Sequence, residues 1–479
     1  MSDEAVEAVA EALQAALSHE RDERTGGEAR LVELSAHAGF CQALLTVAST
    51  DDAPRALRQV AATTFKNHVR VQWPKGDEAE YVIGADDRHD VKAHIVRLML
   101  SATDSVVRKQ LSTAVAAISE ADFPERWDNL LPELVAQLDT DDLAQLNGVL
   151  ATLHAVLRKF RVFVDEAVCA AQLRYVLDEL AAPLCALCES TAAALAEHAD
   201  NEAAVVPLLR AALYVTKIFY SLCYPTVPAE FETASDAWFG ALRALLTYDT
   251  PHAAALEHDN DAKPGLLYKV KASVCACCDL WMEKYEEEFD DYVETFVHDA
   301  CALVVALTDE ERHDRLVIAA LGFLRTVAAG PRYDVLQADD TLSNLCVHIV
   351  LPNMAFRDAD AELFEENTTE YIRRDIEGSD SDTRRRAAID LVKGLRVHFT
   401  EAVTAIFSTH INELLDAHAR DGDWKAKDTA LQLITALTVT TFTRRDGARA
   451  TNELVPLLDV YETHVLPELQ RDAAAARRA

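Results

Sequence analysis

Residues 122–138 read DFPERWDNLLPELVAQL, and this stretch decides the fold class. Its opening is typical of a helix start, because Asp122 can cap a helix and Pro124 fits a first turn, where the missing N–H has no partner. Pro132 lies inside the predicted helix and is expected to kink it. The residues at helical spacing that predict one buried face are Leu130, Leu131, Leu134, Val135 and Leu138.

A second amphipathic helix is predicted over Leu143–Phe160, after the short turn DTDD. A kinked helix followed closely by a partner helix is the building block of a HEAT-type α-solenoid. Proteins of this architecture enclose other proteins with their repeats and are not typically catalysts.

Composition supports an array of helices. The chain has 479 residues, of which 50% are hydrophobic, and only 14 glycines and 14 prolines. A single compact core is unexpected at this length, which leaves several globular domains or one elongated array. Few turn-forming residues argue against a strand-rich fold, and alanine, leucine and glutamate favour helices.

Helical patterns continue along the whole chain with short breaks, and no strand-like alternation is found. We therefore predict an all-α protein: a single continuous α-solenoid, a superhelix of HEAT-like antiparallel helix pairs, over residues 1–479. Loops are expected at Pro74–Gly84 and Asp249–Lys263, and the acidic run Glu286–Asp291 is expected to end a helix. The other expected helices include Glu28–Thr50 (split near Gly39), Pro54–Trp73, Ala170–Glu197, Glu202–Cys223, Gly265–Tyr285, Arg384–Phe399, Val403–Ala417, Trp424–Val439 and Glu453–Leu466.

The formal net charge of −34 restricts the partners. Such a surface repels phosphate backbones, so nucleic-acid binding is not expected, and basic partners are favoured. The same acidity could equally serve only to keep a large protein in solution. No apolar run is judged long enough for membrane insertion, and the acidic N-terminus does not resemble a targeting sequence.

The sequence contains no recognisable active site. It has no GxxxxGK[ST], GxSxG or HExxH motif, so no catalytic residues, cofactor site or enzyme activity are expected. Ten cysteines include the pair Cys185 and Cys188 and the cluster Cys275, Cys277 and Cys278. Their spacing does not suit zinc, so no metal site is expected, and they are predicted to be buried free thiols in a reduced, intracellular protein.

One segment, Arg357–Arg386, breaks the apolar rhythm with ten acidic and six basic residues. Repeat packing needs no such stretch, so we interpret it as a charged insertion within a repeat. It is either a solvated loop or a loop that contacts a partner, because insertions in repeat proteins often lie on the binding face.

The N-terminal region, residues 28–101, resembles the N-terminal domain of the importin-β (karyopherin) superfamily. The resemblance rests on the helix Ala61–Arg70 with its Phe-Lys-Asn run, on Trp73, and on the F-P-x-x-W motif at Phe123–Trp127. The large aromatic residues Phe65, Trp73, Phe123 and Trp127 are expected to pack the core.

Within that superfamily, residues 150–479 resemble the central repeats of the exportin-2 family. The matching strings occur in the family's order and extend to about Leu466. They are Lys92–Ser101, Asn147–Leu150, Phe219–Leu222, Lys284–Phe289, Pro352–Arg357, Tyr371–Asp380 and Asp382–Ala387.

The resemblance implies a nuclear transport receptor that binds Ran in its GTP form and exports importin-α from nucleus to cytoplasm. It implies contact with nuclear pore proteins, shuttling between the two compartments and presence at the nuclear envelope. The alternative is an importin-type carrier or another HEAT-repeat scaffold. By resemblance the insertion lies near Ran, and the candidate Ran-binding residues are Lys66, Asn67, Glu365, Glu366, Glu370, Arg373, Arg374 and Asp375.

Length is where the chain departs from the family, whose members are about twice as long. The resemblance therefore covers the N-terminal half, and a fragment, a gene-prediction error and a natural truncation remain open. Later Ran contacts and much of the importin-α contact belong to the other half. The last repeat is expected to expose apolar surface, because terminal repeats normally carry a polar cap.

Overall fold

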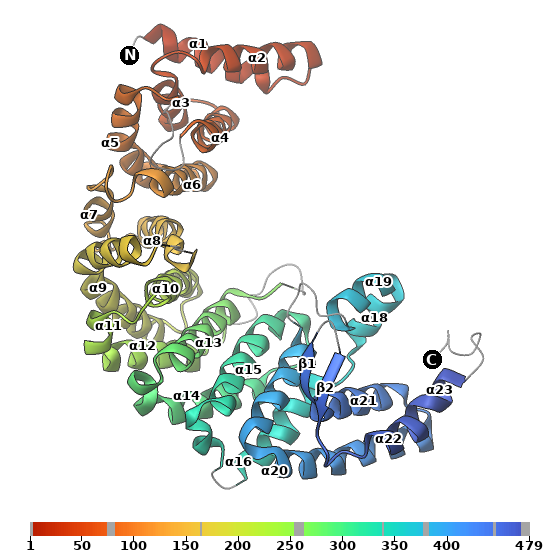
Figure 1. Ribbon diagram of the computed structural model, residues 1–479. Helices are drawn as coiled ribbons and strands as arrows, with labels where there is room; N and C mark the ends of the chain where they lie inside the picture. Colours follow the sequence, from red (N-terminus) through yellow and green to blue (C-terminus); the bar gives the residue numbers. More distant parts are fainter. Residues whose placement is uncertain are drawn as a thin grey trace. The chain divides into compact units, whose positions relative to one another are not determined.

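The computed structural model describes residues 3–73, 82–162, 165–252, 263–337, 340–376, 383–443 and 447–470. Most of the two expected loops, the end of the charged segment and the Ala/Arg-rich C-terminal tail lie outside these ranges. The chain divides into two compact units, Met1–Trp238 and Phe239–Ala479, and each is described by itself (Figure 1).

Unit 1 has two layers of helices, and within each layer every helix contacts the next one in the series. One layer consists of α1 (Asp3–Ala16), α3 (Phe40–Ser49), α5 (Ala85–Ser101), α7 (Leu130–Val135), α9 (Glu166–Glu197) and α11 (Ala229–Thr233). The other consists of α4 (Arg55–Gln72), α6 (Ser105–Asp122), α8 (Leu143–Leu157), which continues as the 3-10 helix η1 (Arg158–Val162), and α10 (Glu202–Cys223). The remaining helix, α2 (Arg21–Leu34), packs on α1.

Unit 2 repeats the arrangement, and α13, α15, α20 and α21 form its continuous row (Figure 1). The helices of this part are α12 (Ser235–Thr247), α13 (Leu266–Lys284), α14 (Glu286–Ala306), η3 (Glu311–His313), α15 (Asp314–Ala329), η4 (Pro331–Leu336), α16 (Thr341–Asn344), η5 (Leu345–Val350) and α17 (Leu351–Met354). They continue as α18 (Asp358–Glu366), α19 (Thr368–Tyr371), η6 (Ile372–Ile376), α20 (Arg384–Asp421), α21 (Trp424–Thr438), α22 (Leu457–Val460), η7 (Tyr461–Val465) and α23 (Leu466–Gln470).

The predicted all-α class, an α-solenoid of HEAT-like helix pairs, is confirmed. One element was not predicted: a β-hairpin of β1 (Val439–Thr443) and β2 (Gly447–Thr451), paired antiparallel. It follows α21 directly, so the expected helix from Glu453 begins only at Leu457. Among the last described residues, several large apolar ones are exposed, including Leu454, Leu458 and Leu469.

The segment quoted first does not form one capped helix. Asp122 is the last residue of α6, and its side chain is completely buried. The carboxylate binds Lys92 Nζ at 2.9 Å and Arg126 Nε at 3.3 Å. Two cations thus hold Asp122 inside the protein, where it joins α5 to the turn that begins at Phe123 instead of capping a new helix. The Phe123–Pro124 peptide bond in this turn is cis.

The expected kink at Pro132 is also absent. Helix α7 begins at Leu130, so Pro132 lies in its first turn, where a backbone N–H needs no partner within the helix. The apolar stripe itself is confirmed for Leu130, Leu131, Leu134 and Leu138, which are buried, while Val135 is half-buried. Helix α8 then starts after Asp142, whose carboxylate accepts hydrogen bonds from the N–H groups of residues 144 and 145.

One further boundary differs from expectation. The acidic run at Glu286 begins helix α14, where its carboxylates face the positive end of the helix dipole. The break expected between the two helices on either side of residue 400 is confirmed, because element α20 is kinked at Phe399, where the backbone angles are non-helical. The expected break near Gly39 is confirmed, since this glycine adopts a left-handed conformation immediately before α3.

Contrary to the expectation from sequence, α9 and α10 are long and apolar enough to cross a membrane by length and composition alone. Core helices pass the same test. These two pack on each other and on neighbouring helices of unit 1, with α7 against α9 and α8 against α10. Burial within the helical layers accounts for their composition.

The aromatic residues expected in the core are buried, and Trp127 is among the largest side chains that solvent does not reach. We predict that Trp127→Ala lowers the free energy of local opening around α6 and α8 by about 3–5 kcal/mol, through the cavity it leaves. Hydrogen exchange of the amides in these helices measures this change. Trp424→Ala, at a half-exposed tryptophan, is the control and should leave α6 and α8 unchanged. Equal protection of these amides from exchange in the Trp127 variant and the wild type would contradict the conclusion that Trp127 packs in the core.

Candidate protein-interaction site

The charged segment connects the two helices of one pair in unit 2. It leaves the continuous helix that ends with α17, forms α18, α19 and η6, and returns at the N-terminus of α20 (Figure 1). Arg384, Arg385 and Arg386, which the sequence assigned to the insertion, belong instead to the first turn of α20.

The entry to this segment is fixed by an ion pair between Arg357 and Asp314. Asp314 is the first residue of α15. Arg357 donates from Nη1 and Nη2 to the two carboxylate oxygens of Asp314, at 2.7 and 3.1 Å. Nη1 also donates to the backbone carbonyl of Asp309 at 3.0 Å. The side chain of Arg357 is only 8% exposed, so this two-pronged contact forms away from bulk water.

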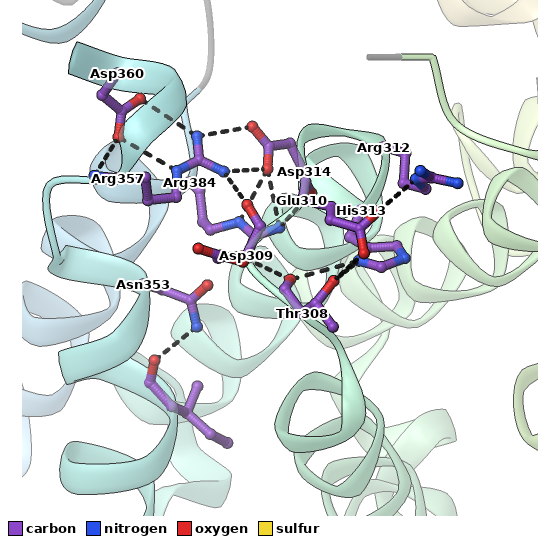
Figure 2. A network of polar contacts seen from close by, with 11 residues as sticks. Thr308, Asp309, Glu310, Arg312, His313, Asp314, Asn353, Arg357, Asp360 and Arg384 are labelled. Atoms are coloured by element: carbon purple, nitrogen blue, oxygen red, sulfur yellow. Dashed lines mark hydrogen bonds and ion pairs between the residues drawn. The ribbon is translucent and has the colours of Figure 1, made fainter. Parts of the chain in front are cut away.

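The exit is fixed by the same carboxylate (Figure 2). Arg384 lies 2.9 Å from Asp314 Oδ1 through Nη2 and donates from Nε at 3.0 Å. Its remaining donors bind the backbone carbonyls of Thr308 and Glu310, at 3.0 and 3.2 Å. With an exposed fraction of 5%, the Arg384 side chain is buried as well. Asp314 therefore holds both ends of the insertion.

The electrostatics differ between the two arginines. Burial alone would lower the pKa of Arg357, but the hydrogen bonds and charges of Asp314 and Asp360 raise this pKa above its ordinary value. Burial, together with the charge of Arg357, lowers the pKa of Arg384, and Asp314 offsets only part of this effect. Both guanidinium groups stay charged because their ordinary pKa is so high. Two positive charges thus share the half-buried carboxylate of Asp314, and each depends on it.

The loop before α15 completes the network. His313 is buried, its Nδ1 lies 3.0 Å from Thr308 Oγ1, and its ring meets Tyr268 edge to face at 4.7 Å. Burial is the main cause that lowers the pKa of His313. Arg312 pairs with Glu310 at 2.7 Å. These contacts fix the loop whose carbonyl groups receive Arg384, as Figure 2 shows.

A second set of contacts holds the body of the insertion. The backbone N–H of Arg357 donates to Asp360 at 3.0 Å, which satisfies a donor at the start of α18. Tyr371 of α19 is buried against Phe356 and Phe364, with ring centroids 5.8 and 5.4 Å apart. Phe356 also contacts Trp424 at 4.9 Å, which connects this aromatic cluster to α21.

The outward surface of the insertion carries the predicted acidic residues. Glu365 and Glu366 end α18, Glu370 lies in α19, and all three are exposed. Arg373 in η6 is exposed and Arg374 is half-buried. Asp375 lies in the same turn, with its side chain outside the described residues. The structure thus brings six of the eight candidates into one short segment and places this segment by Asp314.

The other two candidates, Lys66 and Asn67, lie on α4 of unit 1. Asn67 is exposed and Lys66 is half-buried. They follow Phe65, which is fully buried, so Lys66 and Asn67 lie directly beside a core residue of this helix. Because they belong to the other compact unit, they form a separate candidate surface.

The described residues show no group that suggests chemistry. Among them no three His, Cys, Asp or Glu residues are arranged to hold a metal ion. The cysteines are free and, apart from half-buried Cys301, buried. Burial raises the pKa of the Cys275 and Cys301 thiols to about 12, which disfavours the nucleophilic thiolate. The arrangement is suited to recognition by charge and shape.

Sequence reasoning missed Asp314 and misread the roles of Arg357 and Arg384. It counted the two arginines among the charges of a solvated segment, although both are buried and oriented inward. One feature of the sequence could have indicated their buried roles. Each arginine lies next to an apolar run, at a point where the insertion joins a packed helix.

Models of known families match most of the chain. The Importin-beta N-terminal domain matches residues 27–101. The Cse1 family model matches residues 156–477, which include the insertion and its anchors. The chain belongs to the Cse1 family.

Curated relatives support this membership. Exportin-2 of Oreochromis niloticus is 37% identical over 473 residues, and Exportin-2 of Homo sapiens is 36% identical over the same length. In both cases the match covers 98% of this chain and 48% of the relative. The chain thus spans about half the length of the Cse1-family members it matches.

Solved structures of known proteins support the same family membership. The exportin Cse1 in its cargo-free, cytoplasmic state aligns with a TM-score of 0.87 and 30% identity, over 98% of this chain and 50% of that one. Importin beta aligns with a TM-score of 0.58 at 12% identity, over 98% and 49%. The second likeness shows that the Cse1-family chain shares its helical fold with importin-β.

We predict that Asp314→Ala destabilises the insertion and the first turn of α20 by about 3–5 kcal/mol, because it leaves two buried arginines without their carboxylate. Faster hydrogen exchange in α18 and at the start of α20 measures this loss. Asp358→Ala is the matched control, since Asp358 pairs with Lys425 at the surface and should give no measurable change. Equal exchange in the two variants would mean that Asp314 does not anchor the insertion.

Proposed function

We propose that this chain is a nuclear transport receptor that binds Ran in its GTP form and exports importin-α from nucleus to cytoplasm. The observation that carries this proposal is the match to the Cse1 family over residues 156–477, together with relatives named Exportin-2 across almost the whole chain. The chain would shuttle between the two compartments, contact nuclear pore proteins and visit the nuclear envelope. No chemistry by the chain itself is required.

The geometry of the insertion supports recognition of a basic surface. Three exposed glutamates, Glu365, Glu366 and Glu370, lie on a segment whose two ends are bound to the carboxylate of Asp314. A surface fixed before binding loses little conformational entropy when a partner docks. The net charge of −34 adds attraction at long range, which speeds encounter with a basic partner.

The fold is compatible with such partners. Kap121p, which is 14–15% identical to this chain, has been solved bound to RanGTP and bound to Nup53p. That likeness concerns the fold alone, so partner identity rests on the family membership. The decisive experiment therefore concerns the nucleotide state of Ran.

We predict that the purified chain retains Ran loaded with a non-hydrolysable GTP analogue at least about tenfold more strongly than Ran loaded with GDP, a typical size for coupling between two ligands. Pull-down over a concentration series measures the ratio, with and without importin-α. Equal retention of the two nucleotide forms, or retention of neither, would contradict the proposed function.

We predict that the triple reversal Glu365→Lys, Glu366→Lys and Glu370→Lys weakens binding to GTP-loaded Ran about tenfold and flattens its salt dependence, because the attraction is between charges. Titration calorimetry at two salt concentrations measures both effects.

The control triple, Glu166→Lys, Glu189→Lys and Glu197→Lys, makes the same change in net charge on exposed positions of α9. It should keep most of the affinity. If both triple variants bind Ran as the wild type does, the insertion does not contribute to Ran binding. If both lose affinity equally, only the overall charge matters.

A further inference from the structure

Thr308 lies in the short loop between α14 and η3, where the sequence reads TDEE. Although the chain has 80 acidic residues, Thr308 is its only serine or threonine that three acidic residues follow directly. Protein kinases select substrates partly by the pattern of charges beside the hydroxyl group. Carboxylates after the hydroxyl complement a kinase with a basic substrate groove. Thr308 is therefore a candidate acceptor of phosphate.

The loop around Thr308 is accessible. Thr308, Asp309 and Glu310 are all exposed, and none of them belongs to a helix. The Thr308 hydroxyl donates to Glu310 Oε1 at 3.0 Å, which is a contact at the surface. A kinase has to bring the hydroxyl into its own active site, and an exposed loop allows this more easily than a helix does.

The same loop holds the anchors of the insertion. Its three consecutive backbone carbonyl groups all accept hydrogen bonds from the two anchor arginines (Figure 2). Arg384 donates to the carbonyls of Thr308 and Glu310, at 3.0 and 3.2 Å. Arg357 donates to the carbonyl of Asp309 at 3.0 Å. A change at Thr308 therefore acts on the residues that position the insertion.

A phosphate on Thr308 would alter the charge balance of this loop. The hydroxyl group, which also lies 3.0 Å from His313 Nδ1, would no longer donate to Glu310. Phosphorylation would add about two negative charges next to Asp309 and Glu310. Because like charges repel, the loop would leave its present position and withdraw its carbonyl groups from Arg384.

Two nearby cations, Arg312 and Arg384, could instead attract the phosphate. Arg312 is paired with Glu310 at 2.7 Å, and Arg384 binds Asp314 through Nε and Nη2. A phosphate that attracts Arg384 competes with Asp314 for the same guanidinium group. Repulsion within the loop and competition for Arg384 therefore both weaken the contact between α20 and Asp314.

We propose that Thr308 is phosphorylated by a Ser/Thr kinase that recognises acidic residues after the hydroxyl, and that the phosphate releases the exit of the insertion from Asp314. The Thr308 oxygen attacks the γ-phosphorus of ATP, the new O–P bond replaces the bond to ADP, and the hydroxyl proton passes to the kinase. A fixed acidic surface thereby becomes a loosely held one. The proposal concerns the position of the insertion and does not depend on which partner the insertion binds.

The first experiment tests recognition. The full chain, and a synthetic peptide of residues 303–314, are incubated with casein kinase 2 and MgATP, and mass spectrometry locates the phosphate. We expect Thr308 of the full chain to be modified at least about tenfold faster than Thr140, which only two acidic residues follow. Modification of the peptide but not of the chain would show that the loop is closed to the kinase. That result, or modification of neither, would overturn the proposal.

The second experiment tests release. Hydrogen exchange in the first turn of α20 should be at least about tenfold faster in the phosphorylated chain than in the unmodified one, because the contact to Asp314 is weakened. The Thr308→Val variant, treated with the kinase in the same way, keeps the backbone carbonyl and lacks the hydroxyl. It should exchange as the unmodified chain does.

A further control separates the position of the charge from its amount. The double variant Ser408→Glu with Thr409→Glu adds two negative charges at exposed positions of α20, beyond its kink. Its first turn should exchange as in the wild type. Equal acceleration in this variant would mean that added charge at any position suffices. Unchanged or slower exchange in the phosphorylated chain would mean that the phosphate does not release the insertion, and either result would overturn the proposal.

Discussion

Two guanidinium groups are buried against one half-buried carboxylate when unit 2 folds, and much of the site depends on this three-way contact. Arg357 and Arg384 each bind Asp314 through two nitrogens, at distances from 2.7 to 3.1 Å. Desolvation makes each buried ion costly, so the cluster is stable only when all three are present and their remaining donors are satisfied. Backbone carbonyls before α15 meet that condition. Helices α15, α18 and α20 are thereby fixed to one point.

Much of the fold follows from local sequence. Spacing of 3.6 residues correctly predicts most helices, because the apolar stripe of each helix is buried against its neighbours. The predicted helix boundaries are wrong where contacts between residues distant in sequence determine the ends of a helix. Asp122 is a good helix cap by type, yet Lys92, thirty positions earlier, holds its carboxylate in the core at the end of α6. The hairpin at Val439–Thr451 lacks an alternating pattern of its own, so sequence reasoning missed it.

In the candidate site, too, some features can be predicted from local sequence and others depend on contacts between residues distant in sequence. Its acidic surface can be predicted from composition, since Glu365, Glu366 and Glu370 stand in a segment too polar to be buried. Its anchors cannot, because Arg357 and Arg384 lie 43 and 70 positions from Asp314 in sequence. An arginine in a charged run looks solvated until the fold brings a carboxylate to it.

The central claim is that Asp314 holds the insertion as a fixed surface. Spin labels at Glu365→Cys on α18 and Glu401→Cys on α20 would test it by pulsed electron–electron resonance, since both sites are exposed. We expect one narrow distance distribution in the otherwise wild-type chain and a broad one once Asp314→Asn is added. A broad distribution with Asp314 in place, or an unchanged narrow one in its absence, would show that Asp314 does not fix the insertion.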